Sequence, residues 1–448
     1  MNIELPGVFL IANKRSQTLG GISFLERQLR ILQRLGFREA TICSTSGDCA
    51  ATQLHGSSWA RAELRLKFVS RPDAALTIEK IRQALPASGR LLFCGEDYCD
   101  ARLWRALAQR TTTTLLIESD PPAGLLPLWA GLRRRSFGFA SRIALLEPEW
   151  LARMEPAAAL LAQLEESAAT ARIEVIDAAQ ERAYVTGQRR DVRPLWFPAP
   201  EPARQRLAES VLYDGIQNGV LDFPALLHAP IETWIVRRLC RTAIRPNHVT
   251  CVTLLLGLAV TLFLANGNLW PGTVFALAVG VLDGIDGKLA RLKVETTELG
   301  KREHALDYAL ELTWWTALAH YFSVHDLGAK SWVLWLLFVG SDLIARAAKS
   351  VVKKKTDRYL DDVSRFDRRF RLIAGRRNIY IWIFAAGLIL GMPAVAFQLL
   401  CWWGVATAAV HVLRSWQIRS THPPGTADGT LRRYTASVAS RESADPIV

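Results

Sequence analysis

The feature that most constrains this chain is a series of long apolar segments in its C-terminal half. They lie at residues 249–267, 270–289, 304–323, 331–349, 378–392 and 394–415. A helix needs about 20 mainly apolar residues to cross the hydrocarbon core of a bilayer, and several of these segments approach that length. The pattern predicts an all-α polytopic membrane domain with six transmembrane helices over residues 248–416.

The charges between these segments predict which ends of the helices face the cytoplasm. The segment 346–377 contains twelve Lys or Arg against four Asp, and the loop 290–303 contains four basic residues, Arg291, Lys293, Lys301 and Arg302. The turns near Gly267 and Pro393 have no Lys or Arg, and the turn near Asp326 has only Lys330. Basic connections are typical of the cytoplasmic side, so we expect both termini in the cytoplasm and the protein in the inner or plasma membrane.

The net charge of the chain is +13, and the positions of its basic residues indicate what kind of partner they contact. The basic residues gather beside apolar segments, which favours contact with membrane lipids and their anionic headgroups over binding of nucleic acid. The seven cysteines are scattered without a CxxC pair, which indicates reduced thiols in a cytosol-like compartment. The N-terminus lacks the basic-then-apolar order of a signal peptide.

The first 200 residues have the pattern of a separate soluble α/β domain. Apolar runs at 7–12, 39–43, 63–69 and 90–94 predict strands, and Ile22, Leu25, Leu29 and Leu32 recur at helical spacing between the first two runs. Strands that alternate with helices predict a layered, mainly parallel sheet. Residues 201–247 are expected to be a connector that ends in an interfacial amphipathic helix over 231–247. Residues 417–448 are expected to form a disordered tail.

Acidic residues stand at the end of the second apolar segment, in LDGIDGKLAR (282–291). On a helix Asp283, Asp286, Gly287, Ala290 and Arg291 share one face. Gly287 and Ala290 remove side-chain bulk there, so that a ligand or a neighbouring helix can approach closely. The plain alternative is that these acids extend into water or pair with nearby arginines.

The third segment opens with a second acidic pair, Glu303 and Asp307, four residues apart on one helical face. A short loop joins the two helices, so four carboxylates are expected to converge. Like charges packed together at membrane depth are costly, and two divalent cations would cancel them. Oxygen ligands favour Mg²⁺, Mn²⁺ or Ca²⁺ over zinc, and a two-metal site suits phosphoryl transfer.

These residues resemble the motif of the CDP-alcohol phosphotransferase (CDP-alcohol phosphatidyltransferase) family, which is DxxDGxxAR, eight residues, G, three residues, D, three residues, D. Residues 283–291 fit its first part at every fixed position, and Gly300 follows as expected. The strict spacing would place the last two aspartates at His304 and Tyr308. A register shorter by one residue supplies Glu303 and Asp307, and a longer one supplies Asp307 and Glu311. Residues 246–250, PNHVT, are similar to the PN-x-x-T element of the family, and the resemblance covers about residues 205–415.

The resemblance implies an integral-membrane transferase that moves a substituted phosphate group from a CDP-linked donor to an acceptor alcohol and releases CMP. It implies that two Mg²⁺ or Mn²⁺ ions are held by Asp283, Asp286, Glu303 and Asp307, with Asp307 also the general base. Donor binding falls to Gly287, Ala290, Arg291 and Gly300. Arg376 and Arg377, before the fifth segment, are candidates for binding an acceptor phosphate, with membrane anchoring as the alternative. His248 and His304 are weaker candidates for contact with the site.

The N-terminal half is similar to nucleotidyltransferases of the sugar-phosphate type. The stretch LLFCGEDYCDARLWRAL resembles the strand that carries their metal-binding aspartate, here Asp97. Their glycine-rich loop follows the first strand, but here that place reads IANKRSQTLGG, with Lys14 and Arg15 present and the glycines late, at Gly20 and Gly21. The resemblance therefore implies a nucleotidyltransferase-like domain, either degenerate or active.

Two alternatives stay open beside the transferase. A bifunctional enzyme would also make the CDP-alcohol from CTP in its N-terminal half, and a non-catalytic scaffold or transporter would retain only the fold. The sequence favours phospholipid or polyol-phosphodiester biosynthesis, but it leaves open whether the donor is a CDP-lipid or a CDP-polyol. It also leaves open whether the acceptor alcohol is phosphorylated or a lipid, and whether the protein is a homodimer.

Overall fold

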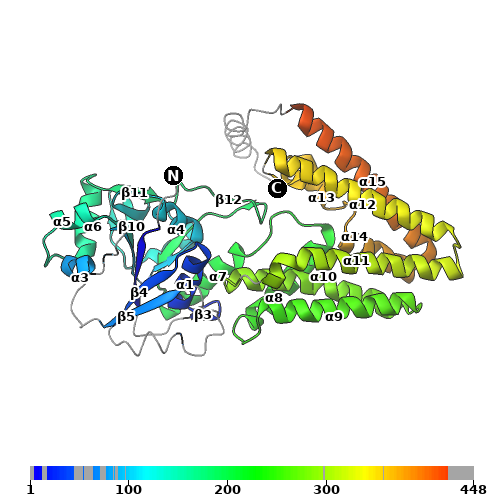
Figure 1. The fold of residues 1–448 in the computed structure, drawn as a ribbon, viewed down its shortest axis with the longest axis horizontal. Helices are drawn as coiled ribbons and strands as arrows, with labels where there is room; N and C mark the ends of the chain where they lie inside the picture. The colour runs from blue at the N-terminus through cyan, green and yellow to red at the C-terminus, as the bar shows by residue number, and fades with distance from the viewer. Residues whose placement is uncertain are drawn as a thin grey trace.

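The protein consists of an α/β domain and a helical bundle that lie end to end (Figure 1). The computed structural model describes residues 5–12, 18–44, 54, 64–70, 77–83, 85, 89–95, 97–295, 298–356 and 358–421. Residues 70, 298–304 and 421 are described by their backbone alone. The predicted tail from residue 422 onward lies outside the described residues, and residues 417–421 continue the last helix of the bundle.

The α/β domain is built on a mixed sheet with the strand order β11-β8-β10-β6-β1-β4-β5, and β9 pairs with β10. Only β10 and β9 break the parallel arrangement, because β10 runs antiparallel to β6, β8 and β9, whereas the other neighbours are parallel. The strands are β1 Gly7–Ala12, β4 Glu39–Ser44, β5 Arg65–Ser70, β6 Leu91–Cys94, β8 Thr114–Glu118, β9 Arg134–Arg135, β10 Gly138–Leu146 and β11 Glu174–Asp177. The prediction of an α/β domain is confirmed, and its four predicted strands correspond to β1, β4, β5 and β6.

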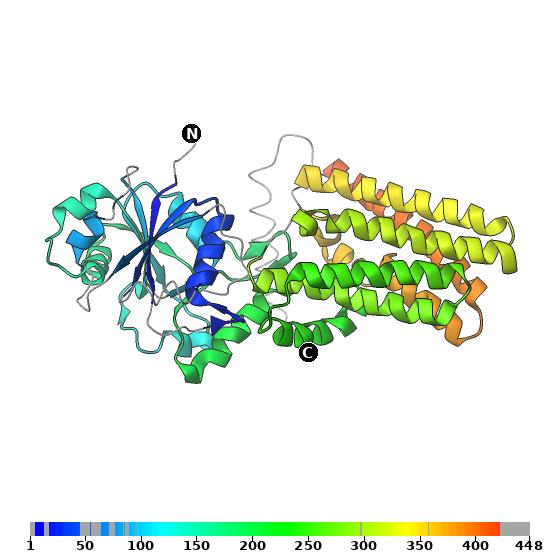
Figure 2. The same ribbon diagram turned by 60° about the horizontal axis from the view of Figure 1, so that its bottom comes forward.

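Helices cover both faces of this sheet. Helix α1 (Phe24–Arg34) lies on the face toward the bundle, whereas α3 (Ile78–Gln83), α5 (Pro148–Arg153) and α6 (Leu160–Ala169) lie on the far face (Figures 1 and 2). Ser23 begins α1 by accepting a hydrogen bond from the Glu26 N–H at 3.1 Å, as an N-cap serine does. The remaining short elements are β2 Thr18–Leu19, β3 Ile22–Ser23, β7 Asp97–Cys99, α4 Ala101–Ala108, η1 Ala123–Trp129, β12 Tyr184–Val185, β13 Arg190–Asp191, β14 Trp196–Pro198 and η2 Pro202–Arg204.

Six helices of the described chain correspond to the six predicted apolar segments. They are α9 Pro246–Ala265, α10 Leu269–Leu292, α11 Glu298–His325, α12 Lys330–Thr356, α14 Arg377–Ile389 and α15 Pro393–Thr421, with η3 Leu360–Asp362 and α13 Arg365–Arg371 before α14. Among the described residues, α9, α12 and α15 are long and apolar enough to cross a membrane, and α14 is a shorter apolar helix. The bundle is therefore a membrane domain, and the full set of six spans stays a prediction.

The predicted amphipathic helix has different bounds in the structure. Two helices form the connector, α7 (Gln205–Gly215) and α8 (Phe223–Leu239). The prediction of one helix over 231–247 is wrong at both ends. Asp222 and Pro224 begin α8 early, since Asp222 caps the helix and proline is favoured in the first turn. Pro246 begins α9 and forces the preceding Arg245 into an extended conformation, with ψ of 159°.

The hydrophobic core runs without a break from the α/β domain into the bundle. Leu29 of α1 belongs to the same cluster of buried side chains as Cys240, Ile285, Leu289 and Leu292. A second cluster fills the far face of the sheet, and a third fills the membrane part of the bundle. The first cluster therefore joins the two halves at the end of α10.

Candidate active site

The predicted acids of α10 lie at the end of the bundle that is next to the α/β domain (Figure 1). Asp286 is buried, whereas the Asp283 side chain remains 34% exposed. Helix α8 packs closely against this part of α10, because a Cβ at Gly284 would overlap the Glu232 carboxylate. Glu232 in turn forms a buried ion pair with Lys288 at 2.8 Å. Burial raises the pKa of Glu232, and Lys288 opposes that rise.

Asp286 is held by groups from two helices. The Thr250 hydroxyl, in the first turns of α9, donates a hydrogen bond to Asp286 Oδ2 at 2.8 Å. The Gly287 N–H donates to Asp286 Oδ1 at 2.6 Å. Two donors on the two oxygens of a buried carboxylate fix its orientation. Thr250 is therefore part of the site, although it was not singled out from the sequence. The PN-x-x-T element in which it stands was the available signal.

Asp283 faces two other helices of the bundle. Arg377 Nη2, at the start of α14, lies 2.7 Å from Asp283 Oδ2. The carboxyl groups of Asp283 and Asp307 lie in contact, and Asp286 is close enough to repel Asp307 electrostatically. The structure thus brings together Asp283, Asp286, Asp307 and Arg377. Glu311 lies one helical turn beyond Asp307 and accepts a hydrogen bond from Trp315 Nε1 at 3.3 Å.

The other predicted donor-binding residues have more varied positions. The Arg291 guanidinium lies 3.6 Å from the point that a Cβ of Gly287 would occupy, and Arg291 Nε donates to the Ile216 carbonyl at 2.9 Å. Ala290 is half-buried beside them. Gly300 and Glu303 lie in the first turns of α11, where only the backbone is described, so the predicted contacts of Glu303 lie outside the described residues.

The two arginines before α14 have different partners. Arg377 reaches Asp283, whereas Arg376 Nε lies 3.6 Å from Asp222 Oδ2 at the start of α8. Of the two candidate histidines, His248 can be assigned. His248 Nδ1 accepts a hydrogen bond from the Arg245 N–H at 3.3 Å, which makes it part of the cap of α9. The His304 side chain lies outside the described residues.

The donor chemistry of the site fits the predicted divalent cations. Two carboxyl groups in contact repel each other unless a proton or a cation lies between them. Asp283, Asp286 and Asp307 present oxygen atoms alone, which Mg²⁺ and Mn²⁺ prefer. Among the side chains that the structure describes, no group of three His, Cys, Asp or Glu is arranged to hold a metal ion. A complete ligand set would therefore need Glu303 or a movement of these acids.

The corresponding acid of the α/β domain is in a different environment. Asp97 is almost fully buried, and its Oδ1 accepts hydrogen bonds from Arg142 Nε at 2.9 Å and Nη2 at 2.5 Å. Its Oδ2 accepts a third bond from the Arg142 N–H at 2.7 Å. The three bonds from Arg142 satisfy both oxygens of the carboxylate without any metal ion. Lys14 and Arg15, the basic residues of the predicted nucleotide loop, lie outside the described residues.

The family model described as CDP-alcohol phosphatidyltransferase matches residues 243–419. No curated protein matches the chain in sequence. Several solved structures have some similarity to it. One is phosphatidylinositol phosphate synthase from Mycobacterium tuberculosis with CDP-DAG bound, with 17% identity, a TM-score of 0.33 and coverage of 46% of this chain and 98% of that chain.

Two other similar structures belong to different proteins. Inositol-1-phosphate CTP transferase from T. maritima has 12% identity and a TM-score of 0.33, over 46% of this chain and 96% of that chain. HddC from Yersinia pseudotuberculosis has 11% identity and a TM-score of 0.33, over 46% of this chain and 99% of that chain.

Proposed function

Residues 243–419 form an enzyme domain of the CDP-alcohol phosphatidyltransferase family, and we propose that it transfers a substituted phosphate group from a CDP-linked donor to an acceptor alcohol with release of CMP. The observation that carries this proposal is the group of acids at one end of the bundle. Asp283 and Asp286 share one face of α10, and Asp307 of α11 contacts Asp283.

In this proposal the acids hold two Mg²⁺ or Mn²⁺ ions, which neutralise charge on the transferred phosphate and on the leaving CMP. Asp283, Asp286, Glu303 and Asp307 are the ligands. Thr250 keeps Asp286 in one orientation through its hydrogen bond. Asp307, on α11, accepts the proton of the acceptor hydroxyl as the general base.

The donor is expected to lie along the face of α10 where side-chain bulk is missing. Gly287 leaves space beside the Arg291 guanidinium, which can donate charge-assisted hydrogen bonds to a phosphate. On the opposite side, Arg377 bridges toward Asp283 and Arg376 toward Asp222. These two arginines suit an acceptor that carries a phosphate group.

The proposal includes the topology. The basic connections and the acids lie at the same end of the bundle as the α/β domain, as expected if that end faces the cytoplasm (Figure 1). Six spans would then place both termini and the site on the cytoplasmic side. Helix α8 presents exposed apolar side chains to the membrane surface, namely Phe223, Leu226, Leu227, Ile231 and Trp234.

The experiment is a CMP-release assay with the purified full-length chain in detergent or vesicles. A panel would combine CDP-lipids and CDP-polyols with lipid, polyol and phosphorylated polyol acceptors, in the presence of Mg²⁺ or Mn²⁺. Release of CMP that depends on both a donor and an acceptor supports the proposal. Its absence across the panel contradicts it.

The second candidate function is synthesis of the CDP-alcohol by the α/β domain. The layered sheet with Asp97 after β6 favours it, whereas the Arg142 pairing of Asp97 opposes metal binding there. Pyrophosphate release from CTP and a phosphorylated alcohol tests it in the same preparation. A lack of release, together with a lack of CTP binding in calorimetry, removes this function.

A further inference from the structure

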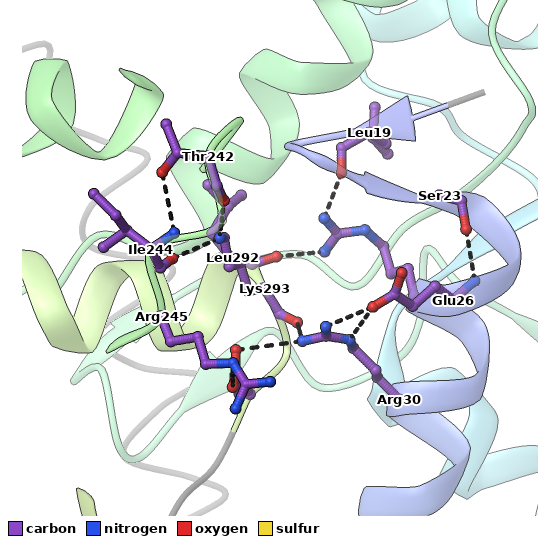
Figure 3. A network of polar contacts seen from close by, with 11 residues as sticks. Leu19, Ser23, Glu26, Arg30, Thr242, Ile244, Arg245, Leu292 and Lys293 are labelled. Atoms are coloured by element: carbon purple, nitrogen blue, oxygen red, sulfur yellow. Dashed lines mark hydrogen bonds and ion pairs between the residues drawn. The ribbon is translucent and has the colours of Figure 1, made fainter. Parts of the chain in front are cut away.

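Helix α1 of the α/β domain contacts the end of the helix that carries the acids. Arg27 Nη1 donates to the Leu292 carbonyl at 2.7 Å, and Arg30 Nη1 donates to the Lys293 carbonyl at 2.8 Å. Figure 3 shows Arg30 reaching the carbonyl of Lys293. We call these two interactions the α1 contact. Carbonyls at the end of a helix have no partner within it, and cations near that end are stabilising. The α1 contact therefore completes the end of α10.

The arginines of the α1 contact are held in place before they meet α10. Arg27 Nη2 also donates to the Leu19 carbonyl at 2.5 Å. Glu26 Oε1 accepts from Arg30 Nε at 2.9 Å and from Nη2 at 2.5 Å (Figure 3). Both arginine side chains are buried. Burial lowers the pKa of Arg27 to about 10, so it remains charged at neutral pH.

Two glycines allow this close approach. A Cβ at Gly21 would overlap the Cys240 carbonyl oxygen, and Gly21 has a φ of +85°, which other residues rarely adopt. A Cβ at Gly20, which has a φ of +60°, would lie 2.9 Å from Leu292 Cδ1. These are the late glycines of the loop after β1. Because they lack a Cβ, the α/β domain can pack closely against Cys240 and Leu292.

A second contact joins the α/β domain to the opposite side of the site. Arg189, in the turn between β12 and β13, donates to Asp361 Oδ2 at 2.7 Å, and Tyr184 hydrogen bonds to Asp362. We call this the hairpin contact. Asp361 also accepts from Arg371 Nη1 at 2.8 Å, and Arg371 is six residues before Arg377, the partner of Asp283. The hairpin contact therefore holds the segment that leads into α14.

The α1 contact holds the helix that carries Asp283, and the hairpin contact holds the segment that leads to Arg377. From Leu292 back to Asp286 is six residues, or about 9 Å along a helix. A helix of this length is stiff, so a shift at its end also moves Asp286. Positions of catalytic groups matter steeply, since a misplacement of about 1 Å can cost about 10²-fold in rate.

We propose that Arg27 and Arg30 are positioning residues for the transferase. Together with the hairpin contact, they set the separation of α10 from α14, so that the α/β domain serves the membrane site directly. The inference rests on the proposed function, because it assigns these arginines an effect on the same acids. It does not require the α/β domain to bind a nucleotide.

The test uses the full-length chain with Arg27→Ala, Arg30→Ala and Arg30→Lys, and Arg105→Ala as the control. Arg105 is an exposed arginine of α4 in the same domain. We expect kcat, measured per folded enzyme, to fall about tenfold or more in both alanine variants. Amide exchange over residues 286–293 should accelerate in them, and Mn²⁺ should bind more weakly. Arg30→Lys should recover part of each loss, because an ammonium group can still donate to one carbonyl.

Each outcome decides the proposal. Unchanged kcat, exchange and Mn²⁺ affinity in Arg27→Ala and Arg30→Ala would overturn it, as would equal effects of Arg105→Ala. A lower melting temperature with unchanged kcat per folded enzyme would show a structural role only and would also overturn it. If the unaltered chain released no CMP, the proposed function would fail, and the exchange and Mn²⁺ measurements would still judge the positioning role.

Discussion

The two halves of the molecule each present acids where a metal-dependent enzyme would need them, but in opposite environments. In the α/β domain, Asp97 is buried and accepts three hydrogen bonds from Arg142. In the bundle, Asp283 is partly exposed and contacts another carboxyl group, Asp307. Arg142 supplies donors to both oxygens of Asp97, so that carboxylate gains little from a further cation. Asp283 has Arg377 on one side but a second acid beside it, and two acids in contact are stabilised by a cation. The environment of an acid, more than its place in a motif, therefore indicates where a metal ion can bind.

Removal of divalent metal should produce the largest difference between the two halves, because it should stop transfer in the bundle and leave the α/β domain folded. Chelation with EDTA is expected to abolish CMP release, and Mg²⁺ or Mn²⁺ should restore it, because the ions would neutralise charge on the transferred phosphate and on the leaving CMP. The α/β domain should keep its melting transition under EDTA, since Arg142 already pairs with Asp97. Full transfer activity in EDTA would contradict the proposed need for a divalent metal ion.

The second largest effect is expected from the substitution of an acid in the bundle. Asp286→Asn keeps the size of the side chain but removes its charge, and we expect a loss of about 10³-fold in kcat. This corresponds to about 4 kcal/mol of lost transition-state stabilisation, within the range for a metal site. Single-turnover CMP release measures it. Activity within threefold of the unaltered chain would contradict the assignment.

Thr250→Val tests the hydrogen bond that orients Asp286, and its effect on kcat should be smaller than that of Asp286→Asn. The variant keeps the shape of the side chain and removes the hydroxyl that donates to Asp286 at 2.8 Å. Loss of such a supporting bond to a metal ligand typically costs about 10–100-fold. We expect kcat to fall in that range, with a higher Mn²⁺ concentration needed for half-maximal rate. Thr253→Val provides the control. In the hydrogen bonds described, the Thr253 hydroxyl donates to a carbonyl of its own helix, that of Val249, at 2.9 Å.

Asp97→Asn should have the smallest effect on transfer. Its pairing with Arg142 is structural, so we expect kcat within about twofold of the unaltered chain. The α/β domain should lose stability, by about 1–3 kcal/mol for a buried charged hydrogen bond, visible as a lower melting temperature. A loss of transfer comparable to that of Asp286→Asn would contradict the division between the halves.

Much of this arrangement was predictable from local patterns. Apolar runs near 20 residues locate the helices of the bundle, and the spacing of Asp283 and Asp286 places both acids on one face. The bounds of α8 were not predictable from charge and apolar spacing. Asp222 and Pro224 set its start, and Pro246 begins the following helix, α9. The antiparallel direction of β10 was also missed, since a strand pattern does not encode the direction of its neighbours.

The contacts between distant segments had no sequence signal of their own. Arg27 and Leu292 are 265 residues apart, and an arginine in an amphipathic helix is ordinarily a solvated residue. Thr250 stood within a quoted element, but its bond to Asp286 depends on how α9 and α10 pack. Such residues emerge only when the helices are placed in space.

The most direct test of the central claim is a Mn²⁺ titration of the full-length chain by electron paramagnetic resonance, comparing Asp286→Asn with Asp97→Asn. If the metal site lies in the bundle, Asp97→Asn binds Mn²⁺ with the affinity and stoichiometry of the unaltered chain, and Asp286→Asn loses this binding. Mn²⁺ binding that survives in Asp286→Asn and disappears in Asp97→Asn would show that the metal site lies in the α/β domain instead.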